Sequence, residues 1–183
     1  MTNLRVPVSE SDHTRGNHHA PVTLVEYGDY ECVQCGRAFP IVERLRGHFG
    51  SKLLFVFRHF PLTQVHPLAE SAAETAEFAG LYGKFWQMHD ALFINQDQLG
   101  MPLLFAMAGV LDLPQTTLHD ALAAGLCAAK VQGDFLGGVR SGVHGTPTFF
   151  INGARHEASY DFGTLATAID FALVEAEGSF FHR

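Results

Sequence analysis

A strand pattern, a helix pattern and a second strand pattern follow one another between residues 22 and 60. Residues 22–27 read VTLVEY, a β-branched and aromatic run typical of a strand. Residues 53–60 read LLFVFRHF, apolar enough for a strand buried on both faces. Between them, apolar residues recur at helical spacing before a glycine stop: Phe39, Val42, Leu45, Phe49 and then Gly50. This order predicts a βαβ unit with parallel strands and a right-handed crossover.

Two cysteines, Cys32 and Cys35, lie where the first strand passes into the helix. Free amides and the dipole at a helix N-terminus favour a negative sulfur, so we expect Cys32 to be the attacking thiolate. The two intervening residues put Cys35 one turn away, where it can close a disulfide or resolve a mixed one. Half of a zinc site and two inert core cysteines are the alternatives.

The zinc alternative is weak because a structural zinc site takes four ligands, usually in paired spacing. No second CxxC and no HxxxH follows the cysteine pair. Neither Cys127 nor the 11 histidines have a spacing that indicates a site, so we expect no metal. Cys127, alone in an alanine-rich stretch, is expected to be a small buried residue.

The middle of the chain changes to Ala- and Leu-rich segments with helical spacing. The breaks between them predict helices over 66–79, 84–94, 102–110, 115–123 and 127–141. After them, residues 145–153 predict a strand between two turns, and residues 162–175 a closing helix. The plan is a polar, loose N-terminal arm over 1–20, an α/β domain over 21–62 and 142–183, and an inserted helical subdomain over 63–141.

Charge and composition limit the class of partner. The 183 residues include 12 basic and 19 acidic ones, a formal net charge of −7. Nucleic acid and an anionic membrane both attract a positive surface, so neither is expected as a partner. No apolar run has the length of a signal peptide or a membrane span, which leads us to expect a cytoplasmic protein. Three cysteines are too few for a secreted disulfide scaffold.

Four segments in order carry a resemblance to a known family: YGDYECVQCGRAFP, FRHFPL, GKFWQMHDALF and GVHGTPTFFING. Together they resemble the bacterial DsbA-like thioredoxin family over about residues 20–172. The resemblance implies a thioredoxin fold, a central mixed sheet flanked by helices, with an inserted helical subdomain. It also implies exchange of disulfides with protein or small-molecule thiols, with no cofactor beyond the Cys32–Cys35 disulfide. The redox partner would be a glutathione- or thioredoxin-type system.

Three further site residues follow from that resemblance. Pro147 matches the family's cis-proline, and Thr146 precedes it; in this fold the pair lies against the CxxC and presents backbone to an extended peptide. Glu26 matches a buried acid beneath the active site. Its strand neighbours are apolar, so we expect its pKa to be raised and its carboxyl to exchange a proton with Cys35.

The dipeptide between the cysteines departs from the family. Val33 and Gln34 replace the Pro-His pair common in strong oxidants, and no histidine lies between the cysteines to hold the thiolate. We place both residues in the substrate-binding surface. His144 lies in the cis-proline loop and is a candidate for contact with the Cys32 sulfur. The alternative is that His144 is only an exposed turn residue.

A thiol–disulfide oxidoreductase is therefore the leading hypothesis. A non-catalytic module that binds peptides or client proteins beside the cis-proline is the alternative, and it predicts binding that survives loss of both cysteines. A glutathione-conjugating enzyme on the same fold is a weaker third reading, because such enzymes generally do not rely on a CxxC.

Overall fold

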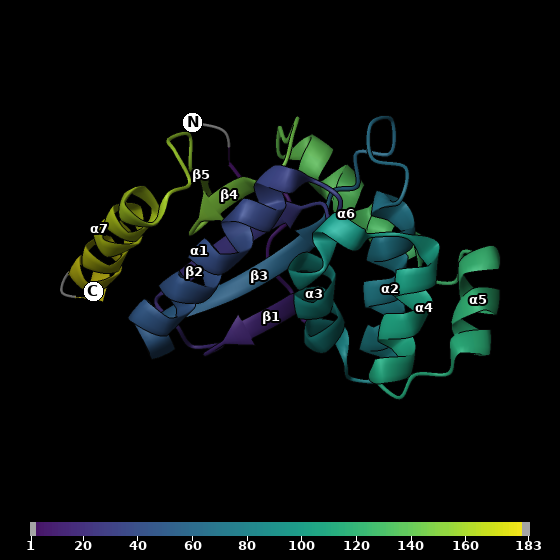
Figure 1. The fold of residues 1–183 in the computed structure, drawn as a ribbon. Coiled ribbons are helices and arrows are strands. Elements are labelled where there is room, and N and C mark those ends of the chain that lie inside the picture. The colour runs from purple at the N-terminus through teal and green to yellow at the C-terminus, as the bar shows by residue number, and fades with distance from the viewer. Residues whose placement is uncertain (1–2, 181–183) are drawn as a thin grey trace.

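A five-stranded mixed sheet forms the centre of the computed structural model, which describes residues 3–180 (Figure 1). The strand order is β1-β3-β2-β4-β5. The strands are β1 (His13–Gly16), β2 (Val22–Gly28), β3 (Leu53–His59), β4 (Thr148–Ile151) and β5 (Ala154–Arg155). Only β2 and β3 run parallel; β1, β4 and β5 each pair antiparallel with a neighbour. The predicted thioredoxin fold with a mixed sheet and a helical insertion is confirmed.

The predicted βαβ unit is present. Strand β2 pairs with β3 from Val22 opposite Leu53 to Gly28 opposite His59, and α1 (Val33–Phe49) connects them. All of β3 and most of β2 are buried, because helices or chain segments cover both faces of the sheet. A short 3₁₀ turn, η1 (Gly50–Lys52), follows α1, and Gly50 has a positive φ of 53° that favours glycine.

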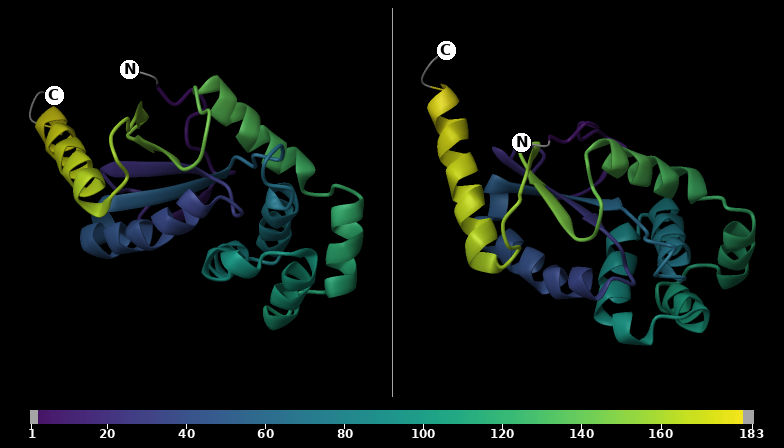
Figure 2. Two further views of the ribbon diagram at one scale, coloured as in Figure 1. Left: turned by 45° about the horizontal axis from the view of Figure 1, so that its top comes forward. Right: turned by 90° about the horizontal axis from the view of Figure 1, so that it is seen from above.

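Two apolar clusters lie on opposite faces of the sheet. The larger contains Leu24, Phe55 and Phe57 and packs them against α1, the helical insertion and α7 (Phe162–Phe180). The smaller contains Val25 and Val56 and is covered by the N-terminal segment and by residues from the end of the insertion. Figure 2 shows α1 on one side of the sheet, the N-terminal segment on the other, and α7 at one end of the molecule.

Five helices form the insertion between β3 and β4, and they agree with the predicted segments to within about three residues (Figure 1). They are α2 (Ala69–Leu81), α3 (Phe85–Ile94), α4 (Met101–Val110), α5 (Gln115–Ala123) and α6 (Ala128–Arg140), with a 3₁₀ turn η2 (Gln96–Gln98) after α3. None of the helices within residues 3–180 has the length and apolarity needed to cross a bilayer. Residues 1–2 of the predicted N-terminal arm and residues 181–183 of the predicted α/β domain lie outside the described residues.

The prediction of a loose arm over residues 1–20 is wrong for the part that the structure describes, from residue 3 onward. Residues 13–16 form β1, which pairs antiparallel with β3 and closes that edge of the sheet. Arg58 of β3 holds the preceding segment: its guanidinium donates to both Asp12 oxygens at 2.7 and 2.9 Å and to the Val6 carbonyl at 2.8 Å. The order of this segment comes from hydrogen bonds and charge together with the packing of Leu4 and Val8 against the smaller apolar cluster. These contacts leave no apolar alternation in the sequence, so the order was not visible there.

Candidate active site

The two predicted redox cysteines lie at the start of α1 in different surroundings. Cys32 is the N-cap residue of α1, with extended backbone angles, and Cys35 lies in the first turn. Cys32 keeps 7% of its surface exposed and Cys35 none. Both thiols are free. The sulfur that a substrate reaches first is therefore that of Cys32, with the second sulfur buried directly beneath it.

Hydrogen bonds lower the pKa of the Cys32 thiol to about 5. The largest contribution is a hydrogen bond from Cys35, which outweighs the opposing effect of burial. Thr146 also lowers this pKa, and the backbone N–H groups of Cys35 and Gln34 add further hydrogen bonds to the sulfur. These are the unpaired amides of the first helical turn, which favour negative charge. At neutral pH the Cys32 sulfur is a thiolate.

Cys35 has the opposite character. Burial raises the pKa of its thiol well above 9, and the hydrogen bond that it gives to Cys32 and the negative charges of Glu26 and Cys32 raise it further. The backbone N–H of Asp29 donates to its sulfur at 3.5 Å. Because the Cys35 thiol stays protonated, it can donate the hydrogen bond that stabilises the Cys32 thiolate. The pair therefore consists of one thiolate and one thiol.

Glu26 lies in the middle of β2, between Phe57 of β3 and Phe149 of β4. It is 2% exposed, and its Oε1 makes no hydrogen bond to the residues that the structure describes. Burial raises the pKa of its carboxyl to about 8, with a smaller contribution from the charge of Cys32. An unpartnered buried acid that titrates near neutrality can both accept and return a proton.

The loop before β4 approaches Cys32 from the other side. The peptide bond between Thr146 and Pro147 is cis. In its protonated form the Cys32 thiol donates to the Thr146 carbonyl at 3.4 Å. His144 lies exposed in the same loop, and no hydrogen bond between it and either cysteine occurs within residues 3–180. The structure brings Thr146 to the sulfur and leaves His144 at the surface.

The dipeptide between the cysteines faces outward. Val33 is 60% exposed, and Gln34 is exposed and accepts a hydrogen bond from the Tyr160 hydroxyl at 2.5 Å. Val33 thus offers an apolar contact next to the reactive sulfur, and the hydrogen bond from Tyr160 restrains Gln34.

Four residues near the site were not predicted from the sequence: Asp29, His66, Gln96 and Tyr160. Gln96, in the η2 turn of the insertion, donates through Nε2 to the Tyr30 carbonyl at 2.8 Å and to the Cys32 carbonyl at 2.9 Å. It ties the insertion to the turn before α1. Asp29, directly after β2, was the one with a sequence signal, since polar residues that follow a buried strand often serve a site.

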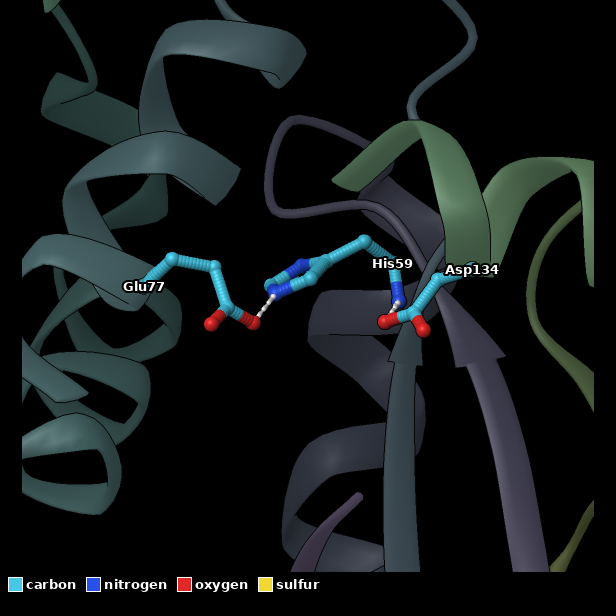
Figure 3. A group of neighbouring side chains, drawn as sticks. All are labelled: His59, Glu77 and Asp134. Atoms are coloured by element: carbon cyan, nitrogen blue, oxygen red, sulfur yellow. Dashed lines mark hydrogen bonds and ion pairs between the residues drawn. The ribbon is translucent and has the colours of Figure 1, made fainter. Parts of the chain in front are cut away.

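A second polar cluster lies away from the cysteines, and Figure 3 shows three of its side chains, from β3, α2 and α6: His59, Glu77 and Asp134. They form the one group of three possible metal ligands among the described residues. Hydrogen bonds among these residues and their neighbours account for the grouping. Glu77 Oε1 accepts from His59 and His13, each at 2.8 Å, and Asp134 accepts from Lys130 and from the His59 backbone N–H. The cluster joins the insertion to β1 and β3.

A model of the thioredoxin family matches residues 8–171. Among curated relatives, the Na⁺/H⁺ antiporter NhaA 1 of Salinispora arenicola (strain CNS-205) is 46% identical over 174 residues, which is 94% of this chain and 26% of that protein. The Na⁺/H⁺ antiporter NhaA 3 of Salinispora tropica is 44% identical and covers 96% of this chain and 27% of that protein. The chain spans about a quarter of the length of the curated relatives it matches.

Solved structures of thiol–disulfide exchange proteins share the fold. BdbD from Bacillus subtilis, in its oxidised form, superposes with a TM-score of 0.80 at 24% identity, over 89% of this chain and 93% of that one. Wolbachia pipientis α-DsbA1 gives a TM-score of 0.82 at 21% identity, over 97% and 98%. At these identities the likeness concerns the fold. This chain belongs to the thioredoxin family, and its fold, helical insertion included, is that of the DsbA-like proteins.

Proposed function

We propose that this chain is a thiol–disulfide oxidoreductase that exchanges disulfides with protein thiols through Cys32 and Cys35. The observation that carries the proposal is the division of the pair: Cys32 lies at the N-cap of α1 with a pKa of about 5, and Cys35 is buried one turn deeper with a raised pKa. Membership of the thioredoxin family supports it.

The Cys32 thiolate attacks one sulfur of a substrate disulfide, forming a mixed disulfide and releasing the other substrate sulfur as a thiolate. Glu26, when ionised, takes the proton of the Cys35 thiol. The Cys35 sulfur then attacks the Cys32 sulfur, closes the Cys32–Cys35 disulfide and releases the second substrate thiolate. Two electrons pass from the pair to the substrate, and the reverse sequence oxidises a substrate dithiol.

The substrate-binding surface in this proposal consists of Val33, Gln34, Thr146, Pro147 and His144. Val33 and Gln34 are exposed beside the reactive sulfur, and His144 is exposed at the rim of the loop. An extended peptide that lies along Thr146 and Pro147 would bring its cysteine to Cys32.

The pKa of Cys32 sets an expected reduction potential. A thiolate pKa of about 5 lies between the values of about 7 in thioredoxin and about 3.5 in DsbA. Each unit stabilises the reduced form by about 1.4 kcal/mol, or about 30 mV for a two-electron couple. Two units above thioredoxin's potential of about −270 mV give roughly −210 mV.

In the cytoplasm, the compartment that we propose, this potential keeps most of the pair reduced. The glutathione poise there is about −220 to −260 mV by extraction, and 30 mV corresponds to about a tenfold ratio for two electrons. The chain would then start as a dithiol that attacks disulfides, with a glutathione- or thioredoxin-type system restoring it. In the much longer curated relatives, we propose that the same exchange chemistry belongs to the matched quarter.

The experiment is turnover of a disulfide-bonded protein substrate by four proteins: wild type and the Cys32→Ser, Cys35→Ser and Cys127→Ser variants. We expect Cys32→Ser to be inactive, Cys35→Ser to accumulate a mixed disulfide at Cys32 that mass spectrometry detects, and Cys127→Ser to keep wild-type turnover. Normal turnover by Cys32→Ser would overturn the proposal. Binding of a reduced peptide that survives loss of both cysteines, with no turnover by wild type, would favour the binding module.

A further inference from the structure

A histidine from the segment that connects β3 to α2 lies beside the active-site turn. His66 donates through Nδ1 to Asp29 Oδ2 at 2.7 Å. The Asp29 side chain is completely buried, and the His66 side chain keeps 23% of its surface exposed. The His66–Asp29 pair therefore extends from the solvent-exposed surface to the interior, close to the start of α1.

The Asp29 carboxylate accepts hydrogen bonds only from N–H groups. Besides His66, the backbone N–H of Leu62 donates to Oδ2 at 2.9 Å, and that of Glu31 donates to Oδ1 at 2.8 Å. Within residues 3–180, the His66 imidazole is the one side chain that donates to Asp29.

The backbone of the same residue is bonded to both cysteines. The Cys32 N–H donates to the Asp29 carbonyl at 3.2 Å, and the Asp29 N–H donates to the Cys35 sulfur at 3.5 Å. Asp29 thus contacts the Cys32 backbone and the Cys35 sulfur through its own backbone, and the His66 imidazole through its side chain.

The negative groups with the largest effect on His66 come from the active-site turn. Burial acts to lower the pKa of His66, but the hydrogen bond to Asp29 and the negative charges of Asp29, Cys32 and Glu31 outweigh it, so that the pKa is raised. The imidazolium is the form that this environment favours. No histidine occupies the two positions between the cysteines, so this is a positive charge brought to the thiolate from a different part of the chain.

We propose that the His66 imidazolium, held by Asp29, is the electrostatic partner of the Cys32 thiolate. The inference rests on the proposed function and names the residue that tunes its nucleophile. His66 acts through space on the charge that Cys32 carries in the reduced protein. In the disulfide that charge is absent, so the imidazolium stabilises the reduced form specifically.

Thermodynamic reciprocity supplies the first test. If the imidazolium stabilises the thiolate, the thiolate must raise the pKa of His66 by the same amount. We expect the pKa of His66, followed by NMR of its ring protons in the wild-type protein, to fall by about one unit when the pair is oxidised, the lower end of the effect of a nearby opposite charge. Equal His66 pKa values in the two redox states would overturn the proposal.

The second test is the His66→Gln variant, in which the amide can still donate to Asp29 without a charge. We expect the pKa of Cys32, measured from the pH dependence of its alkylation rate by mass spectrometry, to rise by about one unit. Alkylation at pH 5 would be roughly fivefold slower, since the thiolate fraction falls from about one half to about one tenth. His66→Lys, which keeps a positive charge, should restore much of the reactivity.

His119→Gln is the matched control, because His119 forms a similar pair with Asp120 at 3.2 Å on the exposed helix α5, at the outer edge of the insertion (Figure 1). It should leave the pKa of Cys32 unchanged. An unchanged Cys32 pKa in His66→Gln, with a reversible Cys32–Cys35 disulfide in wild type, would overturn this inference alone. Loss of that disulfide in the wild-type protein would overturn the proposed function as well.

Discussion

Two buried glutamates next to β3 differ in almost every respect except burial. Glu77 of α2 accepts hydrogen bonds from His13 and His59 on one oxygen, and despite burial these bonds hold the pKa of its carboxyl well below its usual range. Glu26 of β2 has an unpartnered oxygen and a pKa raised to about 8. The partnered acid holds the insertion to the sheet, whereas the unpartnered acid adjoins the cysteines and is free to exchange a proton.

The largest stability effect should come from the partnered acid. Glu77→Gln removes the charge that two imidazoles bind, and hydrogen bonds to a charged group contribute about 1.5 to 3 kcal/mol each, so we expect a loss of about 3 kcal/mol in the free energy of unfolding. Urea denaturation at pH 7 measures it. Glu70→Gln, at an exposed position of α2, is the control and should cost little.

The pH dependence of that difference follows from the sign of the pKa shift. Because the pKa of Glu77 is lowered in the folded protein, its contribution is present above its unfolded value of 4.5 and is lost as the pH falls below it. The wild-type advantage over Glu77→Gln should therefore shrink in acid. A loss below about 1 kcal/mol at pH 7 would contradict a structural role for the cluster.

The unpartnered acid should show the opposite sign. Its folded pKa of about 8 exceeds the ordinary value of 4.5, so the destabilisation that its burial causes is absent below pH 4.5 and grows until pH 8. At 1.4 kcal/mol per unit, Glu26→Gln should be more stable than wild type by up to about 3 kcal/mol at pH 7. Urea denaturation between pH 4.5 and pH 8 checks this.

The same substitution should slow closure of the disulfide by Cys35. The rate of release of a peptide from the mixed disulfide should rise with pH in wild type as Glu26 ionises, with a midpoint at or below about 8 because the Cys32 sulfur is uncharged in the mixed disulfide. Glu26→Gln should lose that step. A Glu26→Gln protein that is less stable than wild type at pH 7, with an unaltered release profile, would remove the contrast between the two glutamates.

The smallest effect concerns Thr146. Thr146→Val keeps the shape of the side chain and removes the hydroxyl through which Thr146 lowers the pKa of Cys32, so that pKa should rise by up to about one unit and the reduction potential fall by roughly 30 mV. Thr75→Val, in α2, is the control, since its hydroxyl bonds only its own helix. An unchanged potential in Thr146→Val would mean that the Thr146 hydroxyl does not contribute to the lowered pKa of Cys32.

The parts of the molecule that the sequence predicted well are those set by local pattern. The run from Val22 to Tyr27 and the apolar β3 segment determined the βαβ unit, because each is long and bounded by a turn. The cysteine pair was identifiable because its position after a strand and before a helix is itself the chemical signal. The helices of the insertion followed from the glycine and proline breaks between them.

What the sequence did not predict depends on contacts between distant segments. β1 has the polar sequence HTRG, and its order comes from pairing with β3 and from the ion pair of Arg15 with Asp90, 75 residues away. Tyr160 reaches Gln34 across 126 residues, and Gln96 reaches Cys32 across 64. No spacing rule brings such residues together, so the supporting residues of the site became visible only in the folded chain.

The most direct measurement of the proposed redox function is the equilibrium reduction potential of Cys32 and Cys35 in glutathione buffers, with the thiols trapped and counted by mass. We expect one reversible two-electron disulfide between these cysteines, with a potential of roughly −210 mV and Cys127 free throughout. The absence of a reversible Cys32–Cys35 disulfide would contradict the assignment of this chain as a thiol–disulfide oxidoreductase. A potential at or below about −270 mV would contradict the low pKa assigned to Cys32.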